Sequence, residues 1–322
     1  MPAGRLTDVP DVLVGHWSDP SVPTGCTVVI PPVEMVGAID VGGGGASTRE
    51  TALFTPGFSE RAVSALVFSG GSAFGLATAD GVMRWCEENG RGIDTGPARV
   101  PIVPAAVIYD LGIGGSRRPG PDEGYAACLA ASAEPHAVGS VGAGTGATVG
   151  KWHAQEGWCK GGIGAASATT PAGYTVAALA VVNAFGDILD ESGEVLAGVW
   201  VDGEGFPGAA DLARHERPIH PRLVEGRNTT LIAVATDAPI GAVGAGQVAR
   251  MCRTGLGRAV SPVNTPIDGD VTFALAMPGS ANAFVVGMLA GEIVATAIRE
   301  GVRAATSLGG VPTAQERRSS LS

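Results

Sequence analysis

The stretch Asn228-Thr229-Thr230 has residue types that could do chemistry. It follows the turn-type residues 225–227 and leads into the apolar run 231–236, which is typical of a buried strand. A threonine hydroxyl is a weak nucleophile unless a base lies beside it. Cleavage before Thr229 would give that residue its own α-amino group, whose pKa of about 8 suits a general base. Two interpretations stay open: a self-processing nucleophile, or ordinary strand composition.

Two carboxylates and one amide could serve such a nucleophile. Asp268 and Asp270 stand at positions i and i+2, so in an extended chain their side chains project from the same face. Beside an α-ammonium group they would orient it and tune its pKa, although a turn with a solvated acid pair is the other interpretation. Asn183 lies inside the apolar run 177–186. A buried amide needs partners and is able to donate to an oxyanion.

Lysine is rare in this chain, so the positions where it occurs are informative about function. Of the 21 basic residues only Lys151 and Lys160 are lysine. A lysine where arginine is the rule suggests a need for a compact ammonium group or for a pKa that burial can shift. The alternative for Lys151 is an ordinary surface lysine in a loop.

The glycine-rich segment 140–168 matches nucleotide-binding loops only in part. A P-loop needs glycine six residues before its lysine and Ser or Thr after it, but Thr145 and Trp152 flank Lys151 at those points. Residues 142–147 fit the dinucleotide pattern G-x-G-x-x-A, yet more glycines follow instead of a long helix. A non-enzymatic dinucleotide- or ligand-binding oligomer therefore remains a secondary hypothesis.

Residues 70–75, GGSAFG, resemble a serine nucleophile elbow because they join a predicted strand to a predicted helix. The elbow motif needs glycine at position 74, where the sequence has Phe74. We interpret the segment as a helix start whose free N–H groups face a polar group.

Histidine and cysteine spacing gives no support for a cofactor. The five histidines form no H-x-x-H or H-E-x-x-H motif, and we expect neither a metal nor an organic cofactor. The five cysteines form no C-x-x-C pair, which predicts reduced, buried thiols and a cytoplasmic protein.

Composition narrows the class of partner. The net charge is −10 without a basic stripe, which argues against nucleic acid and anionic membranes. Only 16% of the residues are charged, below the usual share of about 25%, so the chain hides much of its surface. We expect a homo-oligomer.

The elements that must position these residues alternate between strands and helices. Several consecutive strands lack crossover helices, which favours a mixed α/β sandwich of sheets covered by helices. Helices are expected at 122–133, 241–253 and 281–305. A further helix of about four turns is expected after the strand 65–68, with Phe74, Ala77, Val82 and Trp85 on one of its faces. Further strands are predicted at 11–17, 25–31, within 35–47, and at 174–189, 195–206, 231–236 and 268–277.

The remaining segments carry weaker signals. Residues 100–110 are extended, with prolines that indicate an edge or a bulge. Residues 140–168 are expected to be mostly loop and hairpin. Residues 203–228 form a polar connection that divides the chain, and the tail from residue 315 is expected to fray.

With these pieces placed, the chain resembles the L-aminopeptidase/D-Ala-esterase/amidase family, which includes β-aminopeptidases and 6-aminohexanoate-oligomer endohydrolases (nylon-oligomer hydrolases). The resemblance spans nearly the whole chain. It is carried by TDVPDVLVGHW, GCTVVIP, VFSGGSAFGLATADGVMRW, VGAGTGATVGKW, VAALAVVNAFGDI, RNTTLIAVATDA and DGDVTFALA. It implies an α/β, four-layer αββα sandwich and a single catalytic domain that cleaves itself into an α chain, 1–228, and a β chain, 229–322.

The resemblance also implies site residues. Matched by motif, Thr229 takes the place of the nucleophile and Asn228 that of the last α-chain residue. Asp268 and Asp270 match the pair that orients the nucleophile. Asn183 matches the oxyanion-side asparagine.

Lys151 matches the lysine of the nylon-oligomer branch, and Tyr109 lies about where the family has a pocket tyrosine. The implied function is hydrolysis, through an acyl-enzyme, of linear amides or short peptides such as 6-aminohexanoate oligomers or N-terminal aminoacyl peptides. A tetramer is the favoured assembly. The alternative enzyme is an N-terminal-threonine acyltransferase of the ornithine-acetyltransferase kind, which passes the acyl group to an amine.

Overall fold

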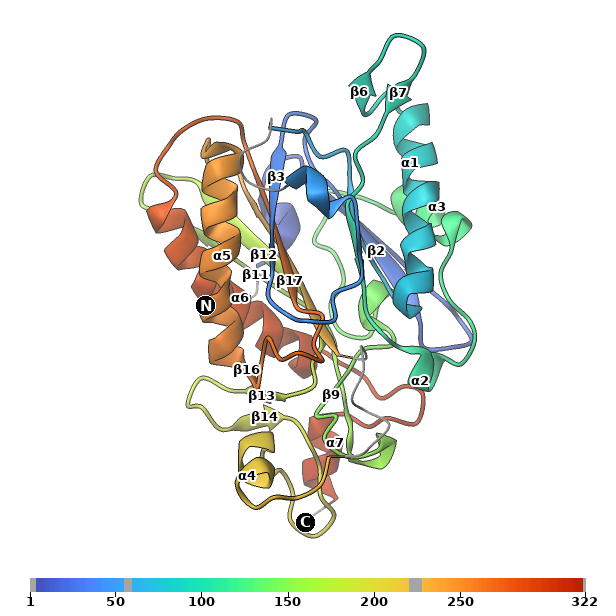
Figure 1. The fold of residues 1–322 in the computed structure, drawn as a ribbon, viewed down its shortest axis with the longest axis vertical. Helices are drawn as coiled ribbons and strands as arrows, with labels where there is room; N and C mark the ends of the chain where they lie inside the picture. The colour runs from blue at the N-terminus through green and yellow to red at the C-terminus, as the bar shows by residue number, and fades with distance from the viewer. Residues whose placement is uncertain (1–3, 55–59, 220–227, 321–322) are drawn as a thin grey trace.

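The structure, a computed structural model, describes residues 4–54, 60–219 and 228–320. Two five-stranded sheets lie face to face, and helices cover the outer side of each sheet (Figure 1). The predicted four-layer αββα sandwich is thereby confirmed. Residues 225–227 of the polar turn and His220 of the polar connection lie outside the described residues.

The first sheet, which we call sheet A, is covered by two helices. Its core residues pack against α1 (Thr78–Glu88) and α3 (Pro121–Leu129). The strands of sheet A, in spatial order, are β1 (Leu13–Ser18), β2 (Gly25–Ile30), β5 (Leu66–Ser69), β8 (Ala105–Val107) and β4 (Thr48–Arg49).

The second sheet, sheet B, is covered by the two longest helices, α5 (Gly241–Ala259) and α6 (Phe284–Arg303). Within the part of the chain that the structure describes, no helix is both long and apolar enough to cross a membrane. The strands of sheet B, in spatial order, are β11 (Gly162–Thr169), β12 (Thr175–Asn183), β15 (Thr229–Thr236), β17 (Val271–Ala276) and β3 (Val36–Val41).

The central strands of sheet B are buried on both faces, and alternate residues serve different layers. In β15, Leu231, Ala233 and Ala235 belong to the core between the two sheets. Ile232 and Val234 belong to the core under α5 and α6. Because side chains alternate along a strand, the residue types at even and odd positions are committed to different environments.

Short elements connect the layers. A small sheet formed by β14 (Val195–Ala197), β13 (Asp187–Leu189) and β16 (Val260–Ser261) lies below the main sheets, next to α4 (Ala209–Arg214) (Figure 1). The others are β6 (Ile93–Asp94), β7 (Arg99–Val100), β9 (Thr148–Val149), β10 (Cys159–Lys160), α2 (Leu111–Gly114), α7 (Ala314–Ser319) and the 3-10 turns η1 (Leu6–Asp8), η2 (Thr51–Phe54), η3 (Ser72–Ala77), η4 (Gly142–Gly144) and η5 (Gln155–Gly157).

Some local predictions were wrong. The segment 100–110 contains β8, which lies inside sheet A between β5 and β4 and not at an edge. The prolines of this segment precede the strand, so no hydrogen bond between strands is lost. The predicted helix begins as the 3-10 turn η3, where Phe74 is exposed under the Arg118 guanidinium. The change from 3-10 to α-helical spacing rotates Phe74 away from the buried face that contains Val82.

Three other segments are more ordered than their polarity indicated. The glycine-rich segment 140–168 ends in the eight-residue strand β11. The polar connection contains α4, which buries Ala209 and Leu212. The tail forms α7, whose N-cap Thr313 accepts from the Glu316 N–H while Glu316 reaches back, a capping box that the sequence contained. All five cysteines are buried free thiols, as predicted.

Candidate active site at the start of strand β15

Three neighbouring strands of sheet B bring the candidate residues together. Asn183, the last residue of β12, is paired directly with Thr229, the first residue of β15. Asn228 forms a parallel bridge with Asp268, just before β17. Side chains of directly opposed residues lie on the same face of a sheet, so Asn183 and Thr229 both face the layer between the sheets. Thr229, which we expected just before the strand, is its first residue.

The carbonyl group of Asn228 is held from two sides. The Thr229 hydroxyl donates to this carbonyl oxygen over 2.5 Å, and the Gly269 N–H donates to it over 2.7 Å. Asn228 and Thr229 are both buried. The peptide bond between them is therefore enclosed, with a hydroxyl beside its carbonyl group.

Asp270 holds the residue that follows Thr229 and the loop before Asp268. Its Oδ1 accepts from the Thr230 N–H over 2.6 Å, and its Oδ2 accepts from the Asn264 N–H over 2.9 Å. Burial, together with repulsion from the Asp268 charge, raises the pKa of Asp270 to about 7. The carboxyl group thus titrates near neutral pH.

Asp268 closes the turn before β17. Its carboxylate accepts from the backbone N–H and from the hydroxyl of Thr265. Burial raises the pKa of Asp268, while the hydrogen bonds from Thr265 and the charge of Lys151 act in the opposite direction. The interpretation as a solvated acid pair was wrong, because both carboxyl groups are 2% exposed.

Lys151 is buried, so the interpretation as a surface lysine was wrong as well. Its Nζ donates to the Asn183 side-chain oxygen over 2.8 Å and to the Asn183 carbonyl over 2.9 Å. Burial, with a smaller contribution from the charge of Lys160, lowers the pKa of Lys151 to about 7, against opposing contributions from Asp268 and Asp110. A lysine with this pKa is partly neutral at neutral pH and can accept a proton.

The Asn183 amide is oriented by its partners. Its Oδ1 accepts from both the Lys151 ammonium group and the Thr148 N–H, so the Nδ2 must point the other way. There it approaches the Tyr109 carbonyl at 3.4 Å, which is a long contact. The amide thus presents N–H donors to the space between the sheets, where Tyr109 lies.

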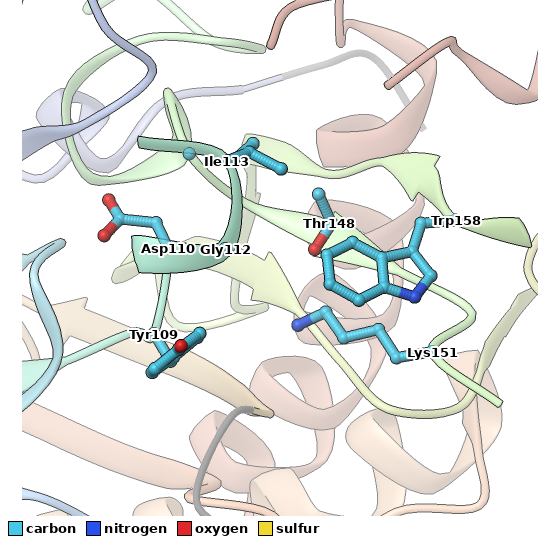
Figure 2. Close-up of a pocket in the computed structure, with 8 residues that line it drawn as sticks. Tyr109, Asp110, Gly112, Ile113, Thr148, Lys151 and Trp158 are labelled. Atoms are coloured by element: carbon cyan, nitrogen blue, oxygen red, sulfur yellow. The ribbon is translucent and has the colours of Figure 1, made fainter. Parts of the chain in front are cut away.

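A small pocket, lined by Lys151, Tyr109 and Trp158 among others, lies beside these residues. Figure 2 shows the Lys151 side chain running beneath the Trp158 indole, with its nitrogen directed toward Tyr109, while the Asp110 carboxylate points away. Trp158 is fixed by its indole N–H, which donates to the His153 carbonyl. Two aromatic residues and two glycines make up half of the lining, and the Lys151 amine is directed toward Tyr109.

The sequence interpretation missed several residues at this site. Gly269 lies between the two predicted aspartates but was assigned no role. The glycine run 42–45, a signal visible in the sequence, packs against the turn that carries Asp268 and Asp270: Gly42 and Gly45 donate N–H bonds to the carbonyls of Asp270 and Asp268. A Cβ at position 43 would lie 2.1 Å from the Asp268 carbonyl oxygen, so only glycine fits.

Lys160 is the second missed residue. It is fully buried and its ammonium group donates to the carbonyl oxygens of Ala147 and Gly161, at 2.7 and 3.2 Å, and to that of Gly144 at 3.4 Å. Burial lowers the pKa of Lys160 to about 7, and the charge of Asp110 acts in the opposite direction. These hydrogen bonds fix the backbone of the segment 144–147, which precedes Thr148.

Two other sequence hypotheses have structural outcomes. Residues 142–147 are buried and form the three-residue turn η4 followed by β9, so the long helix that a dinucleotide site requires is missing. The polar group expected at the elbow-like segment is Asp110, which accepts from the Gly71 N–H over 2.7 Å. Among the described residues, no cluster of three or more His, Cys, Asp or Glu could hold a metal ion.

The comparison with protein families decides the relationship. The model of peptidase family S58 matches residues 4–313. The chain is a member of peptidase family S58.

Proteins with similar sequences carry peptidase or amide hydrolase names. A protein of Mycobacterium tuberculosis (strain H37Rv) described as an uncharacterized aminopeptidase is 40% identical, over 96% of each chain. The 6-aminohexanoate-oligomer endohydrolase of Agromyces sp. is 29% identical over 91% of this chain and 84% of its own. The family resemblance in the sequence is thus confirmed, and the chain is a hydrolase of the peptidase or amidase type.

Solved structures of S58-like aminopeptidases share the fold. A Burkholderia β-aminopeptidase superposes with a TM-score of 0.72 at 21% identity, covering 99% of this chain and 95% of its own. The L-aminopeptidase D-Ala-esterase/amidase of Ochrobactrum anthropi, whose structure is described as a new variant of the Ntn hydrolase fold, gives 0.72 at 18% identity, with coverage of 99% and 94%.

Proposed function

We propose that this S58 hydrolase cleaves its own Asn228–Thr229 bond and then uses Thr229 as an N-terminal nucleophile. The observation that carries the proposal is the position of the Thr229 hydroxyl, 2.5 Å from the carbonyl oxygen of the preceding residue in a buried site. An adjacent hydroxyl is the group required for an acyl shift from nitrogen to oxygen. The chain would then consist of an α chain, 1–228, and a β chain, 229–322, that together form one domain.

In the self-cleavage step Thr229 Oγ attacks the Asn228 carbonyl carbon. We assign the proton transfer to Lys151, because its Nζ lies 2.8 Å from the side-chain oxygen of Asn183, the strand partner of Thr229, and burial lowers its pKa to about 7. Lys151 takes the hydroxyl proton and returns it to the Thr229 nitrogen as the C–N bond breaks. An ester between Asn228 and Thr229 Oγ results. Water then cleaves the ester, leaving a carboxyl group on Asn228 and a free hydroxyl and α-amine on Thr229.

In turnover the same hydroxyl attacks the carbonyl carbon of a substrate amide. The new Thr229 α-amine accepts the proton and delivers it to the leaving amine, so that an acyl-enzyme forms. Asp268 and Asp270 orient that amine; their placement around residues 228–230 supports this role. Asn183, held by Lys151, donates to the substrate oxyanion, and water releases the acyl group.

The substrates that we propose are linear amides or short peptides, among them 6-aminohexanoate oligomers and N-terminal aminoacyl peptides. The relatives named aminopeptidases and 6-aminohexanoate-oligomer endohydrolases support this range. The small pocket between Tyr109 and Trp158 is where we place the acyl group of the substrate. No cofactor takes part in the proposed steps.

Two further predictions belong to this proposal. We expect a homo-oligomer, with a tetramer favoured, and a cytoplasmic location. Large apolar side chains are exposed at the start of α5 and α6, namely Val243, Phe284, Val285 and Met288, and a subunit contact would cover them. Light scattering during size-exclusion chromatography tests the assembly.

Denaturing mass spectrometry of the purified protein tests self-cleavage. Fragments that end at Asn228 and begin at Thr229 are expected. An intact chain in a preparation whose circular dichroism shows complete folding would refute the proposal. A panel of 6-aminohexanoate oligomers, β-peptides and L-aminoacyl amides, each with and without an added amine acceptor, identifies the substrate and separates hydrolysis from acyl transfer.

A further inference from the structure

The backbone conformation of Gly269 does not explain why this residue is a glycine. It is not among the glycines with positive φ, so the backbone there suits any residue. A Cβ at this position would, however, lie 2.8 Å from Thr229 Oγ1. Space for the Thr229 hydroxyl is therefore what requires a glycine.

The N–H of Gly269 donates to the Asn228 carbonyl oxygen over 2.7 Å. This is the oxygen on which negative charge develops when Thr229 Oγ attacks. Donors at 2.7–3.1 Å from such an oxygen, fixed in a water-excluded site, are what stabilises a tetrahedral intermediate. Gly269 thus polarises the carbonyl group and leaves the nucleophile room beside it.

The neighbours of Gly269 hold this N–H rigidly. Asp268 is bonded through its carboxylate to Thr265, and Asp270 through its carboxylate to Asn264 and Thr230. The Gly45 N–H also donates to the Asp268 carbonyl over 2.8 Å. The donor is therefore preorganised, which is the condition under which an oxyanion contact lowers a barrier.

We propose that the Gly269 N–H is the backbone oxyanion donor for both acyl transfers at Thr229: the self-cleavage and the hydrolysis of substrate. The inference rests on the proposed function, because it needs Thr229 as nucleophile. Both tetrahedral intermediates contain a bond from Thr229 Oγ to the attacked carbon, and we place both oxyanions at the Gly269 N–H. Once the ester is hydrolysed and the Asn228 carboxylate leaves, the N–H is available to the substrate carbonyl.

The first experiment removes only this N–H. Glycolic acid, incorporated at position 269 by stop-codon suppression, turns the Asp268–Gly269 amide into an ester and adds no side chain. The matched control is phenyllactic acid at position 273, because Phe273 lies in the same parallel β15–β17 pairing, opposite Ala233. Self-cleavage is followed by denaturing mass spectrometry, and folding by thermal unfolding.

We expect the 269 ester to cleave itself about 100- to 1,000-fold more slowly than the 273 ester, at a similar melting temperature. A hydrogen bond that only completes the strand pairing would change the melting temperature and leave the rate within threefold of the control, and that result overturns the inference. If the unsubstituted chain itself does not cleave at Thr229, the proposed function fails, and this inference with it.

A second measurement does not depend on the folding of any variant. An alkyl boronic acid bound to Thr229 Oγ of the cleaved enzyme places a tetrahedral oxygen where the substrate oxyanion forms. In a crystal structure of this adduct we expect one boronate oxygen at about 3 Å from the Gly269 nitrogen. A separation above about 4 Å excludes Gly269 from turnover.

Discussion

Strand β15 has threonines at both ends, and the two ends are built in different ways. At its end the Thr236 hydroxyl donates to the Thr175 carbonyl over 2.7 Å and accepts from the Ala238 N–H over 3.2 Å. At its start, the Thr230 hydroxyl and both polar atoms of the Asn228 amide are buried without a hydrogen-bond partner among the described residues. Buried polar groups are normally satisfied, so the exceptions need an explanation.

On the proposed function, this difference separates a structural use of threonine from a chemical one. At the end of β15, the hydrogen bonds of the Thr236 hydroxyl terminate the strand and contribute stability. At the start of the strand, partners are concentrated on one carbonyl group, that of Asn228, and the polar side chains around it are left unsatisfied. Sites that do chemistry commonly break the local rules that the rest of a fold obeys. Substitutions at five positions test whether the contrast is functional.

The largest effect is expected from Thr229→Ala. Without the hydroxyl no bond to the Asn228 carbonyl carbon can form, so the chain should stay uncut and hydrolysis should fall below detection. Thr229→Ser retains a hydroxyl and should still cleave. Denaturing mass spectrometry and an amide hydrolysis assay read both outcomes, and a cleaved Thr229→Ala chain would place the nucleophile elsewhere.

Lys151→Met should slow self-cleavage about 100- to 10,000-fold, because it removes the proposed base. In the unsubstituted chain the rate should rise as pH increases through about 7, since the neutral amine accepts the proton and burial lowers its pKa to about 7. Lys151→Arg keeps the positive charge but cannot lose its proton near neutral pH. If Lys151→Arg cleaves at the original rate with the same pH profile, Lys151 acts by charge alone.

Asp270→Asn should slow self-cleavage about tenfold, because one of the two backbone N–H groups loses its acceptor; breaking such a buried bond costs about 1–3 kcal/mol. The pKa of Asp270 is raised to about 7, so the folded chain binds more protons than the unfolded chain between its ordinary pKa and pH 7. Its contribution to stability is therefore present in acid and is lost as pH rises through about 7.

The matching measurement is the free energy of unfolding at pH 5 and pH 8 in the uncut Thr229→Ala background. The chain that retains Asp270 should lose more stability between these pH values than the chain with Asp270→Asn. Equal losses would mean that Asp270 titrates at an ordinary pKa.

The smallest effects are expected from replacing threonine by valine at each end of β15. Thr236→Val leaves the Thr175 carbonyl without its donor and should lower the free energy of unfolding by about 1–2 kcal/mol. Thr230→Val removes a buried hydroxyl that forms no hydrogen bond of good geometry among the described residues, although it lies near the Asp270 carboxyl group, and should raise the free energy of unfolding by at most about 1 kcal/mol. Both should leave self-cleavage intact. Denaturant unfolding in the uncut Thr229→Ala background measures each change, and equal signs would contradict the contrast between the ends.

The sequence was informative wherever the signal is local. Apolar runs gave the central strands of sheet B, and an asparagine inside such a run indicated a buried amide with partners. Sequence reasoning was least reliable in 140–168 and in the tail. The glycine-rich segment contains strand β11 and the polar tail contains the capped helix α7, although neither composition predicts such an element. The stability of both elements comes from packing and not from composition.

By itself, the sequence determined the residue types, the family relationship and the alternation that assigns Thr229 and Thr230 to opposite faces of one strand. Only the tertiary structure decided which strands are neighbours, and so that Asn183, Thr229 and Gly269 lie together. It also decided that Lys151 is buried, with the pKa that burial lowers. The reason is physical: side-chain periodicity depends on neighbours in the chain, whereas strand order and desolvation depend on contacts between distant segments.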